Sequence, residues 1–140
     1  YVAAELQLSD GKKPQALAGF TKYTEQFPTG RYIVDAHYYA AELNREMKAM
    51  PKAMTHYDAV AKLAPNKYAE KSLLLLARYY YFDEKNYSTA SGYYTQLKQQ
   101  ASSNENRLES MRGLARCQYY LNDFANAVAN AKELLQQGKN

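Results

Sequence analysis

Small and bulky apolar residues recur along this chain of 140 residues at a fixed interval. The interval is marked by four alanines that stand 37 residues apart: Ala16, Ala53, Ala90 and Ala127. Four positions after each alanine come Phe20, Tyr57, Tyr94 and Ala131, and three positions further come Tyr23, Val60, Leu97 and Leu134. Residues spaced by three and four share one face of an α-helix. The pattern therefore predicts four copies of one amphipathic helix.

Turn-forming residues set the bounds of these helices and leave room for a second helix in each interval. Pro14 and Pro51 suit the first turn of a helix, and the residues before Pro28 and Pro65 are pushed out of the helical region. We expect the repeated helix over residues 14–26, 51–63, 87–100 and 124–137. The other helix is expected over residues 1–10, 31–48, 67–84 and 105–121.

The third interval departs from the period by one residue. Leu76-Ala77-Arg78 and Leu114-Ala115-Arg116 look equivalent but stand 38 residues apart rather than 37. We therefore expect one extra residue in the third repeat, in its turn from Asp83 to Asn86.

A fixed period of paired helices is typical of a helical-repeat array, in which each repeat buries its apolar face against its neighbours. We expect one array over residues 1–140, with repeats at about 1–28, 29–65, 66–102 and 103–138. The first helix is short and has no obvious polar cap, and the last repeated helix presents Ala127, Ala131, Leu134 and Leu135 on one face. This predicts a segment of a longer protein, or a chain that associates end to end through that helix.

Charge and composition disfavour two classes of partner. The net charge is +4, but the basic residues are scattered and Lys12-Lys13 is their only adjacent pair, which argues against nucleic-acid binding. The longest aliphatic run, Leu73 to Leu76, is far too short to span a membrane, so we expect no direct membrane insertion.

The residues that usually carry chemistry are few and separated. The single cysteine, Cys117, has an interior-looking position, and His37 and His56 fall on different helices without a metal-ligand spacing. No Gly-rich phosphate loop or nucleophile elbow is present. We therefore expect no enzyme, no catalytic residue, no cofactor and no metal site.

The repeated positions resemble those of the tetratricopeptide repeat (TPR) family. That family's pattern of a small residue, an aromatic, a second small or apolar residue and a proline is matched by Ala16-Phe20-Tyr23-Pro28 and by Ala53-Tyr57-Val60-Pro65. The third repeat has Ser102 where the proline would fall, and the fourth has Ala131 in place of the aromatic. The resemblance implies an all-α fold, a right-handed α-solenoid of four helix-turn-helix repeats with about eight antiparallel helices.

The resemblance also implies a function. In this family the first helix of each repeat lines a concave face that meets a protein or peptide, so we expect a non-catalytic interaction scaffold. The residues expected to line that face are Tyr38, Glu42, Arg45, Leu75, Arg78, Tyr79, Phe82, Arg112, Arg116 and Tyr119. The arginines could grip a carboxylate, or could instead pair with Glu42, Glu109 or Asp83 on the protein's own surface.

Two stretches, 27–32 and 86–90, are most similar to bacterial envelope proteins of the TolA-binding and outer-membrane-assembly lipoprotein types. That likeness implies a periplasmic or outer-membrane-associated adaptor, with a cytoplasmic adaptor as the alternative. Two other functions stay open: a structural spacer or self-association module of a larger protein, and a glycan-binding surface of exposed tyrosines. The chain has 15 Tyr but no Trp, which weakens the glycan hypothesis.

Overall fold

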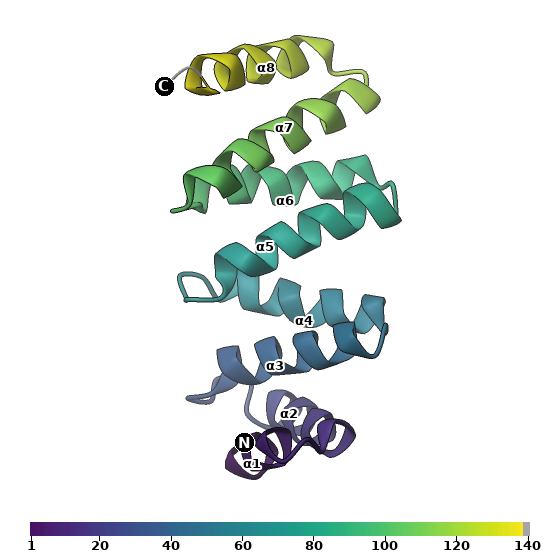
Figure 1. Cartoon of the computed structure of the whole chain (residues 1–140), viewed down its shortest axis with the longest axis vertical. Helices are drawn as coiled ribbons and strands as arrows, with labels where there is room; N and C mark the ends of the chain where they lie inside the picture. Colours follow the sequence, from purple (N-terminus) through teal and green to yellow (C-terminus); the bar gives the residue numbers. More distant parts are fainter. Residues whose placement is uncertain (139–140) are drawn as a thin grey trace. The chain divides into compact units, whose positions relative to one another are not determined.

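The computed structural model describes residues 1–138, which form eight α-helices and one π-helical turn, with no β-strand in that part of the chain (Figure 1). The elements are α1 (Val2–Ser9), α2 (Lys13–Gln26), α3 (Ile33–Glu46), α4 (Met50–Lys62), α5 (Ala69–Arg78), η1 (Tyr79–Asp83), α6 (Tyr87–Gln100), α7 (Asn104–Tyr120) and α8 (Phe124–Gly138). The repeated helices begin and end within one residue of their predicted bounds. The all-α, helical-repeat fold class is therefore confirmed.

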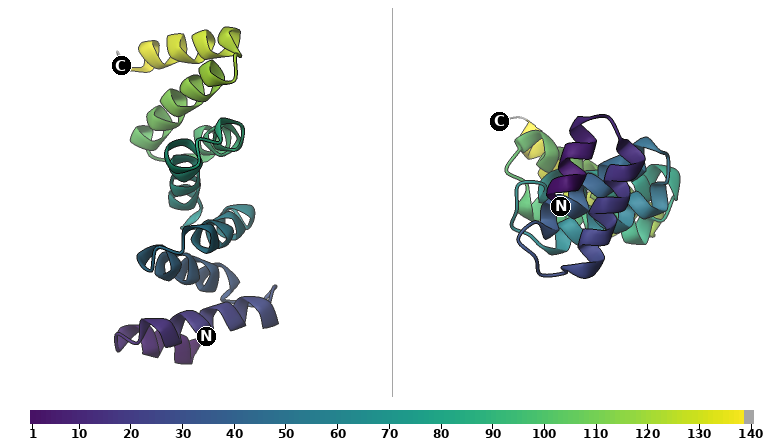
Figure 2. Two further views of the ribbon diagram at one scale, coloured as in Figure 1. Left: turned by 90° about the vertical axis from the view of Figure 1, so that its right-hand side faces the viewer. Right: turned by 90° about the horizontal axis from the view of Figure 1, so that it is seen from below.

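The chain divides into two compact units, an N-terminal unit (Tyr1–Ala69) and a C-terminal unit (Glu70–Asn140). Within the N-terminal unit, α1 packs on α2, α2 on α3 and α3 on α4. Within the C-terminal unit, η1 and α7 pack on α6, and α8 packs on α7. Figures 1 and 2 show that consecutive helices of each unit lie side by side, joined by short turns. Each unit is thus a short stack of helical hairpins.

The turn inside each hairpin has one residue in the left-handed backbone region. These residues keep the period of 37: Gly11 (φ 76°), Lys48 (φ 61°), Lys85 (φ 52°) and Asn122 (φ 64°). A left-handed residue just past a helix end reverses the chain and lets later N–H groups bond the last carbonyls. The N–H of Lys12 bonds the Gln7 carbonyl at 2.8 Å in this way, five residues back.

The extra residue of the third repeat lies in a different place from the one predicted. It was expected in the turn from Asp83 to Asn86, but Lys85 keeps the period, so the turn has its usual length. The helix before it widens into the π-helical η1, where the Glu84 N–H bonds the Tyr79 carbonyl at 3.1 Å. A π-helical turn takes one more residue than an α-helical turn. The insertion is therefore absorbed inside the helix.

Small residues at the repeated positions let the helices approach closely. In the N-terminal unit, Ala16 and Phe20 of α2 are fully buried in one core with Ala36 and Ala40 of α3. In the C-terminal unit, Ala90 and Tyr94 of α6 share a core with Cys117 and Leu114 of α7. The expected interior position of Cys117 is confirmed, and burial raises the pKa of its thiol to about 11.

Gly113 shows how tight this second core is. A Cβ atom added at Gly113 in α7 would clash with the ring of Tyr94 in α6. The ring of Tyr94, only 2% exposed, therefore occupies space that the glycine leaves open. The α6–α7 contact combines a large side chain on one helix with the absence of a side chain on the next.

Candidate functional site

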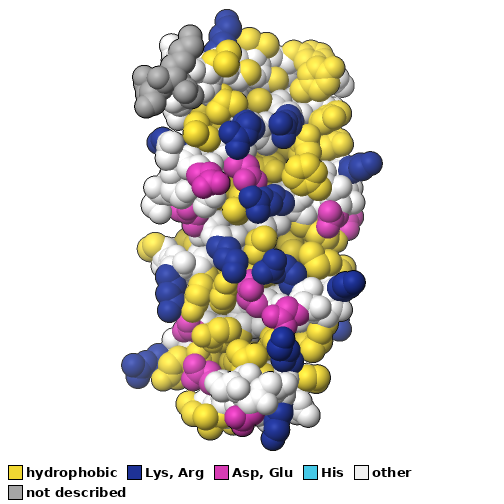
Figure 3. Space-filling view, viewed as in Figure 1, with side chains coloured by type: hydrophobic (Ala, Val, Ile, Leu, Met, Phe, Trp, Pro, Cys, Tyr) yellow, Lys and Arg dark blue, Asp and Glu magenta, His cyan; other side chains and the backbone are white. Residues whose placement is uncertain are grey.

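A groove of about 570 Å³ lies in the C-terminal unit, where α7 and α8 meet. It is lined by side chains of η1, α7 and α8: Tyr81, Ala115, Arg116, Tyr119, Tyr120, Phe124, Ala127, Val128 and Ala131. All but Arg116 are apolar or aromatic. Figure 3 shows hydrophobic side chains gathered over the ends of α7 and α8, at the turn that joins them.

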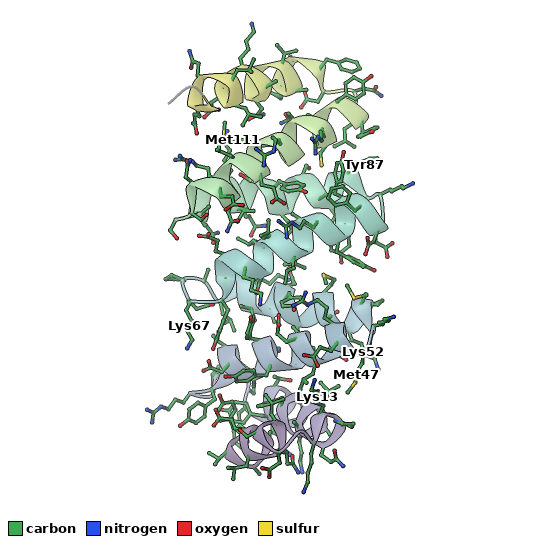
Figure 4. All side chains as sticks on the ribbon, in the orientation of Figure 1. Lys13, Met47, Lys52, Lys67, Tyr87 and Met111 are labelled. Carbon is green, nitrogen blue, oxygen red and sulfur yellow. The ribbon has the colours of Figure 1, made fainter. Side chains whose placement is uncertain are left out.

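The rings of the groove are exposed yet held by their neighbours. Tyr119 is 61% exposed and Phe124 52% exposed, and the two rings meet edge to face with centroids 5.6 Å apart. Tyr120 stacks at 4.4 Å on Tyr87, which is labelled in Figure 4. Aromatic side chains fixed in this way offer contact area at a small entropic cost. The groove therefore presents a partly preorganised apolar surface.

The α8 residues of the groove have counterparts on α6, 37 residues earlier, and those counterparts are covered by the next helix. Ala90 and Tyr94 of α6 are buried, and α7 packs over that helix. Their counterparts on α8, 37 residues later, are Ala127, which is 9% exposed, and Ala131, which lies open in the groove. Among the described helices, α8 packs against α7. Val128, next to Ala127 on α8, is 52% exposed and lines the groove.

Arg116 supplies the charge of the groove. Its side chain is exposed, and it forms no ion pair within residues 1–138. A free guanidinium beside an apolar surface can receive a carboxylate through two parallel hydrogen bonds.

Of the residues predicted from the sequence, the structure brings Arg116 and Tyr119 together in this groove. Arg78 is engaged elsewhere, because its Nε and Nη2 donate to the two oxygens of Glu109 at 2.7 and 2.6 Å. These hydrogen bonds hold the pKa of the Glu109 carboxyl below its ordinary value. Arg78 therefore takes the alternative expected for it, a pair on the protein's own surface. Arg112 is exposed on the same helix as Glu109.

Other predicted residues have intramolecular partners as well. In the N-terminal unit, Tyr38 stacks on Tyr68 with centroids 3.9 Å apart, and Glu42 binds Arg45 at 3.1 Å. Glu42 also accepts a hydrogen bond from the hydroxyl of the buried Tyr57. Each of these three residues therefore has a contact inside the N-terminal unit.

The remaining three predicted residues lie in or near η1. Leu75 in α5 is half-buried, and the hydroxyl of Tyr79 donates to Glu84 at 2.6 Å, a bond that raises the pKa of Tyr79 to about 12. Phe82 is 57% exposed and meets the ring of Tyr81 at 4.7 Å. Phe82 does not line the groove.

The sequence did not indicate that four further residues belong to the groove: Tyr81, Tyr120, Phe124 and Val128. The sequence did indicate one side of it, since Ala127 and Ala131 were assigned to an uncovered helix face. A usable signal was the replacement of the aromatic by Ala131 in the fourth repeat, because it removes a ring from a position that is otherwise filled.

The two histidines, expected on different helices without a metal-ligand spacing, lie together between α3 and α4. The Nδ1 atoms of His37 and His56 are 2.9 Å apart, and the ring centroids are 5.1 Å apart. Burial and the neighbouring His56 lower the pKa of His37 to about 4, and burial lowers the pKa of His56. One neutral imidazole therefore donates to the other. Among the described residues, no group of three or more metal-ligating side chains is present.

This architecture, paired helices in a fixed period with left-handed turns, defines an α-helical repeat protein. Residues 35–67, which contain α3 from its third residue onward, its turn and all of α4, match the model of the family described as "Tetratricopeptide repeat". This segment is thus similar to a tetratricopeptide repeat, which supports the resemblance of the whole pattern to that family. No curated protein matches the chain. Within residues 1–138, no helix combines the length and hydrophobicity that crossing a membrane requires.

Proposed function

We propose that this protein is a non-catalytic interaction module that binds a segment of a partner protein in the groove between α7 and α8. Tetratricopeptide repeats generally mediate protein–protein interactions, and this chain contains a segment similar to one. The observation that carries the proposal is the set of exposed, mutually braced rings at Tyr119, Tyr120 and Phe124.

The energetics favour a macromolecular partner. Complete burial of a fully exposed side chain of this size contributes about 1.5–3 kcal/mol, and these rings are still 52–61% exposed, so burying the rest of each contributes roughly half of that and together offsets part of the cost of association. Interfaces draw most of their binding energy from such aromatic and arginine anchors. Arg116 at the same groove adds a charged contact that orients an acidic group of the partner.

The setting we propose for this module is an assembly of the bacterial cell envelope. Support for it comes from the similarity of stretches 27–32 and 86–90 to envelope proteins with these repeats. Cell fractionation of the source organism tests the location: recovery with periplasmic or outer-membrane fractions is expected, and recovery with cytosolic proteins alone contradicts it.

The groove is tested by affinity capture from the source organism with three forms of the protein. Tyr119→Ala combined with Phe124→Ala removes two rings from the groove, whereas Phe82→Ala removes an equally exposed ring outside it. Partners retained by the wild type and by Phe82→Ala, but lost by the double variant, are expected. Equal capture by all three forms, each folded by circular dichroism, would place binding elsewhere.

A further inference from the structure

We infer that the partner segment is an amphipathic α-helix that carries an acidic residue and, four residues later, a large apolar side chain. This inference rests on the proposed function and adds the chemistry of the partner to it.

The contact between α6 and α7 is the template. α7 is the element that covers Ala90 and Tyr94 on α6, and the groove presents the equivalent positions, Ala127 and Ala131, one period later. Repeated surfaces of the same backbone geometry accept the same kind of element. The segment that fits the groove is therefore a helix placed on α8 as α7 is placed on α6.

The volume of the groove specifies one side chain of that helix. On α6 the ring of Tyr94 fills the space opposite Gly113 of α7, which has no side chain. On α8 the ring is replaced by the methyl group of Ala131, and the space remains open as part of the 570 Å³ groove. Close packing requires that this space be filled. The partner helix therefore carries a large apolar side chain where α7 has Gly113.

The charge of the groove specifies a second side chain. Arg78 and Arg116 follow the same Leu-Ala pair, 38 residues apart, and Arg78 binds Glu109 of the covering helix through two hydrogen bonds. Arg116 is exposed and has no ion-pair partner within residues 1–138. A carboxylate at the position of Glu109 would meet it. Glu109 stands four residues before Gly113, which sets the spacing of the two side chains.

A second copy of this chain does not offer that pattern on a free helix. Within the described helices, an acidic residue is followed four residues later by a large apolar residue at Asp35–Tyr39 and at Glu70–Leu74. Tyr39 packs against the core of the N-terminal unit, and Glu70 accepts hydrogen bonds from Ser102 and Asn106. No free helix within residues 1–138 supplies the pattern, and the occupant we propose is a helix of another protein.

The test uses synthetic helices derived from α7 itself, residues 104–120, bridged by a lactam so that their helicity is equal. One peptide carries Gly113→Phe and its control carries Gly113→Ala, because alanine restores helix propensity without filling the groove. Fluorescence anisotropy with the full chain should show that the Phe peptide binds about tenfold more tightly than the Ala peptide. In a protein with Ala131→Tyr, that preference should disappear.

The charged contact is tested by exchanging the charges of its two partners between peptide and protein. Glu109→Arg in the Phe peptide should weaken binding to the wild-type protein about tenfold, and Arg116→Glu in the protein should restore it. Equal binding of the Phe and Ala peptides, or failure of the exchange to restore affinity, overturns the inference. So does sedimentation of the protein as a dimer that Ala131→Tyr abolishes, because a second copy would then fill the groove.

These outcomes are separable from failure of the proposed function. If the helices fail but captured partners are still lost with Tyr119→Ala and Phe124→Ala, the groove is a binding site for a segment of another kind.

Discussion

The hairpins α3–α4 and α7–α8 have the same backbone plan and differ in the side chains between their helices. Both turns hold a left-handed residue, Lys48 in one and Asn122 in the other, with φ of 61° and 64°. In both, an N–H past the turn bonds a carbonyl five residues back at 2.8 Å, from Ala49 to Asn44 and from Asp123 to Gln118.

Between the helices the two hairpins diverge. Positions 74 residues apart correspond, so His37 and His56 of the first hairpin become Met111 and Asn130 of the second, and the buried Tyr57 becomes the open Ala131. The first hairpin therefore holds two titratable rings and a buried tyrosine, whereas the second holds the buried Met111 and the hydrogen-bonded Asn130 and is open at Ala131. A backbone defined by small residues and turns leaves these positions free to acquire different chemistry.

The largest effect expected from this comparison is at the position of the ring. Tyr57→Ala should lower the free energy of unfolding by about 4 kcal/mol, because it leaves a cavity and removes the hydrogen bond to Glu42. The reciprocal change, Ala131→Tyr, should alter it by less than about 1 kcal/mol, since the ring enters an open groove. Urea unfolding at pH 7 measures both. Similar costs for the two changes would mean that the hairpins are filled alike.

A smaller change in stability is expected at the contact between α6 and α7, where the ring of Tyr94 packs against Gly113. Gly113→Ala should destabilise the protein by about 2–3 kcal/mol, because its Cβ would overlap the ring of Tyr94. Gly92→Ala in α6 is the control: its Cβ would meet nothing within 4 Å, so alanine should stabilise the helix by roughly 0.5–1 kcal/mol. The two midpoints in urea should move in opposite directions. Tolerance of Gly113→Ala would show that α7 lies farther from Tyr94.

The histidine pair should make stability depend on pH through the first hairpin. The pKa of His37 falls from its ordinary 6.5 to about 4 in the folded chain, so the folded state resists protonation that the unfolded state accepts. The stabilisation is complete above pH 6.5 and is lost as the pH falls toward 4. Between pH 7 and pH 5 the loss should be roughly 2 kcal/mol.

The matched control transfers the residues of the second hairpin into the first. His37→Met with His56→Asn should flatten the pH dependence between pH 7 and pH 5, because neither new side chain titrates there. Urea unfolding at both pH values, in the wild type and in this variant, gives the comparison. A slope that survives the double substitution would assign the pH dependence to other groups.

The sequence predicted the fold well because its signals are local and repeated. The alanine spacing and the prolines placed the repeated helices to within one residue. The offset between Arg78 and Arg116 revealed an inserted residue, but not that η1 absorbs it. A longer turn and a widened helix would both give the spacing of 38 residues between Arg78 and Arg116. The left-handed Lys85 distinguishes them, because it shows that the turn keeps its usual length.

The groove was predicted only in parts because it depends on how two helices pack. Arg116 and Tyr119 were selected on one helix and Ala131 on another, and no periodicity states that these residues meet. The same limit applies to His37 and His56, whose contact at 2.9 Å crosses from α3 to α4. Spacing along a helix fixes a face, whereas contacts between helices also require their relative rotation and offset.

The smallest difference between the two hairpins lies in their turns. A left-handed conformation costs an L-residue about 1–2 kcal/mol, and it costs Asn less because the Asn side chain can hydrogen-bond locally. Glycine avoids this cost but loses about 0.5–1 kcal/mol through the greater entropy of the unfolded chain. Lys48→Gly should therefore stabilise the protein by about 0.5 kcal/mol, and Asn122→Gly should change it by less, since Lys48 and Asn122 have nearly the same φ of 61° and 64°. Thermal unfolding of the two variants beside the wild type resolves this ranking. A larger gain at Asn122 than at Lys48 would show that the turn of the second hairpin, next to the groove, is the more strained of the two.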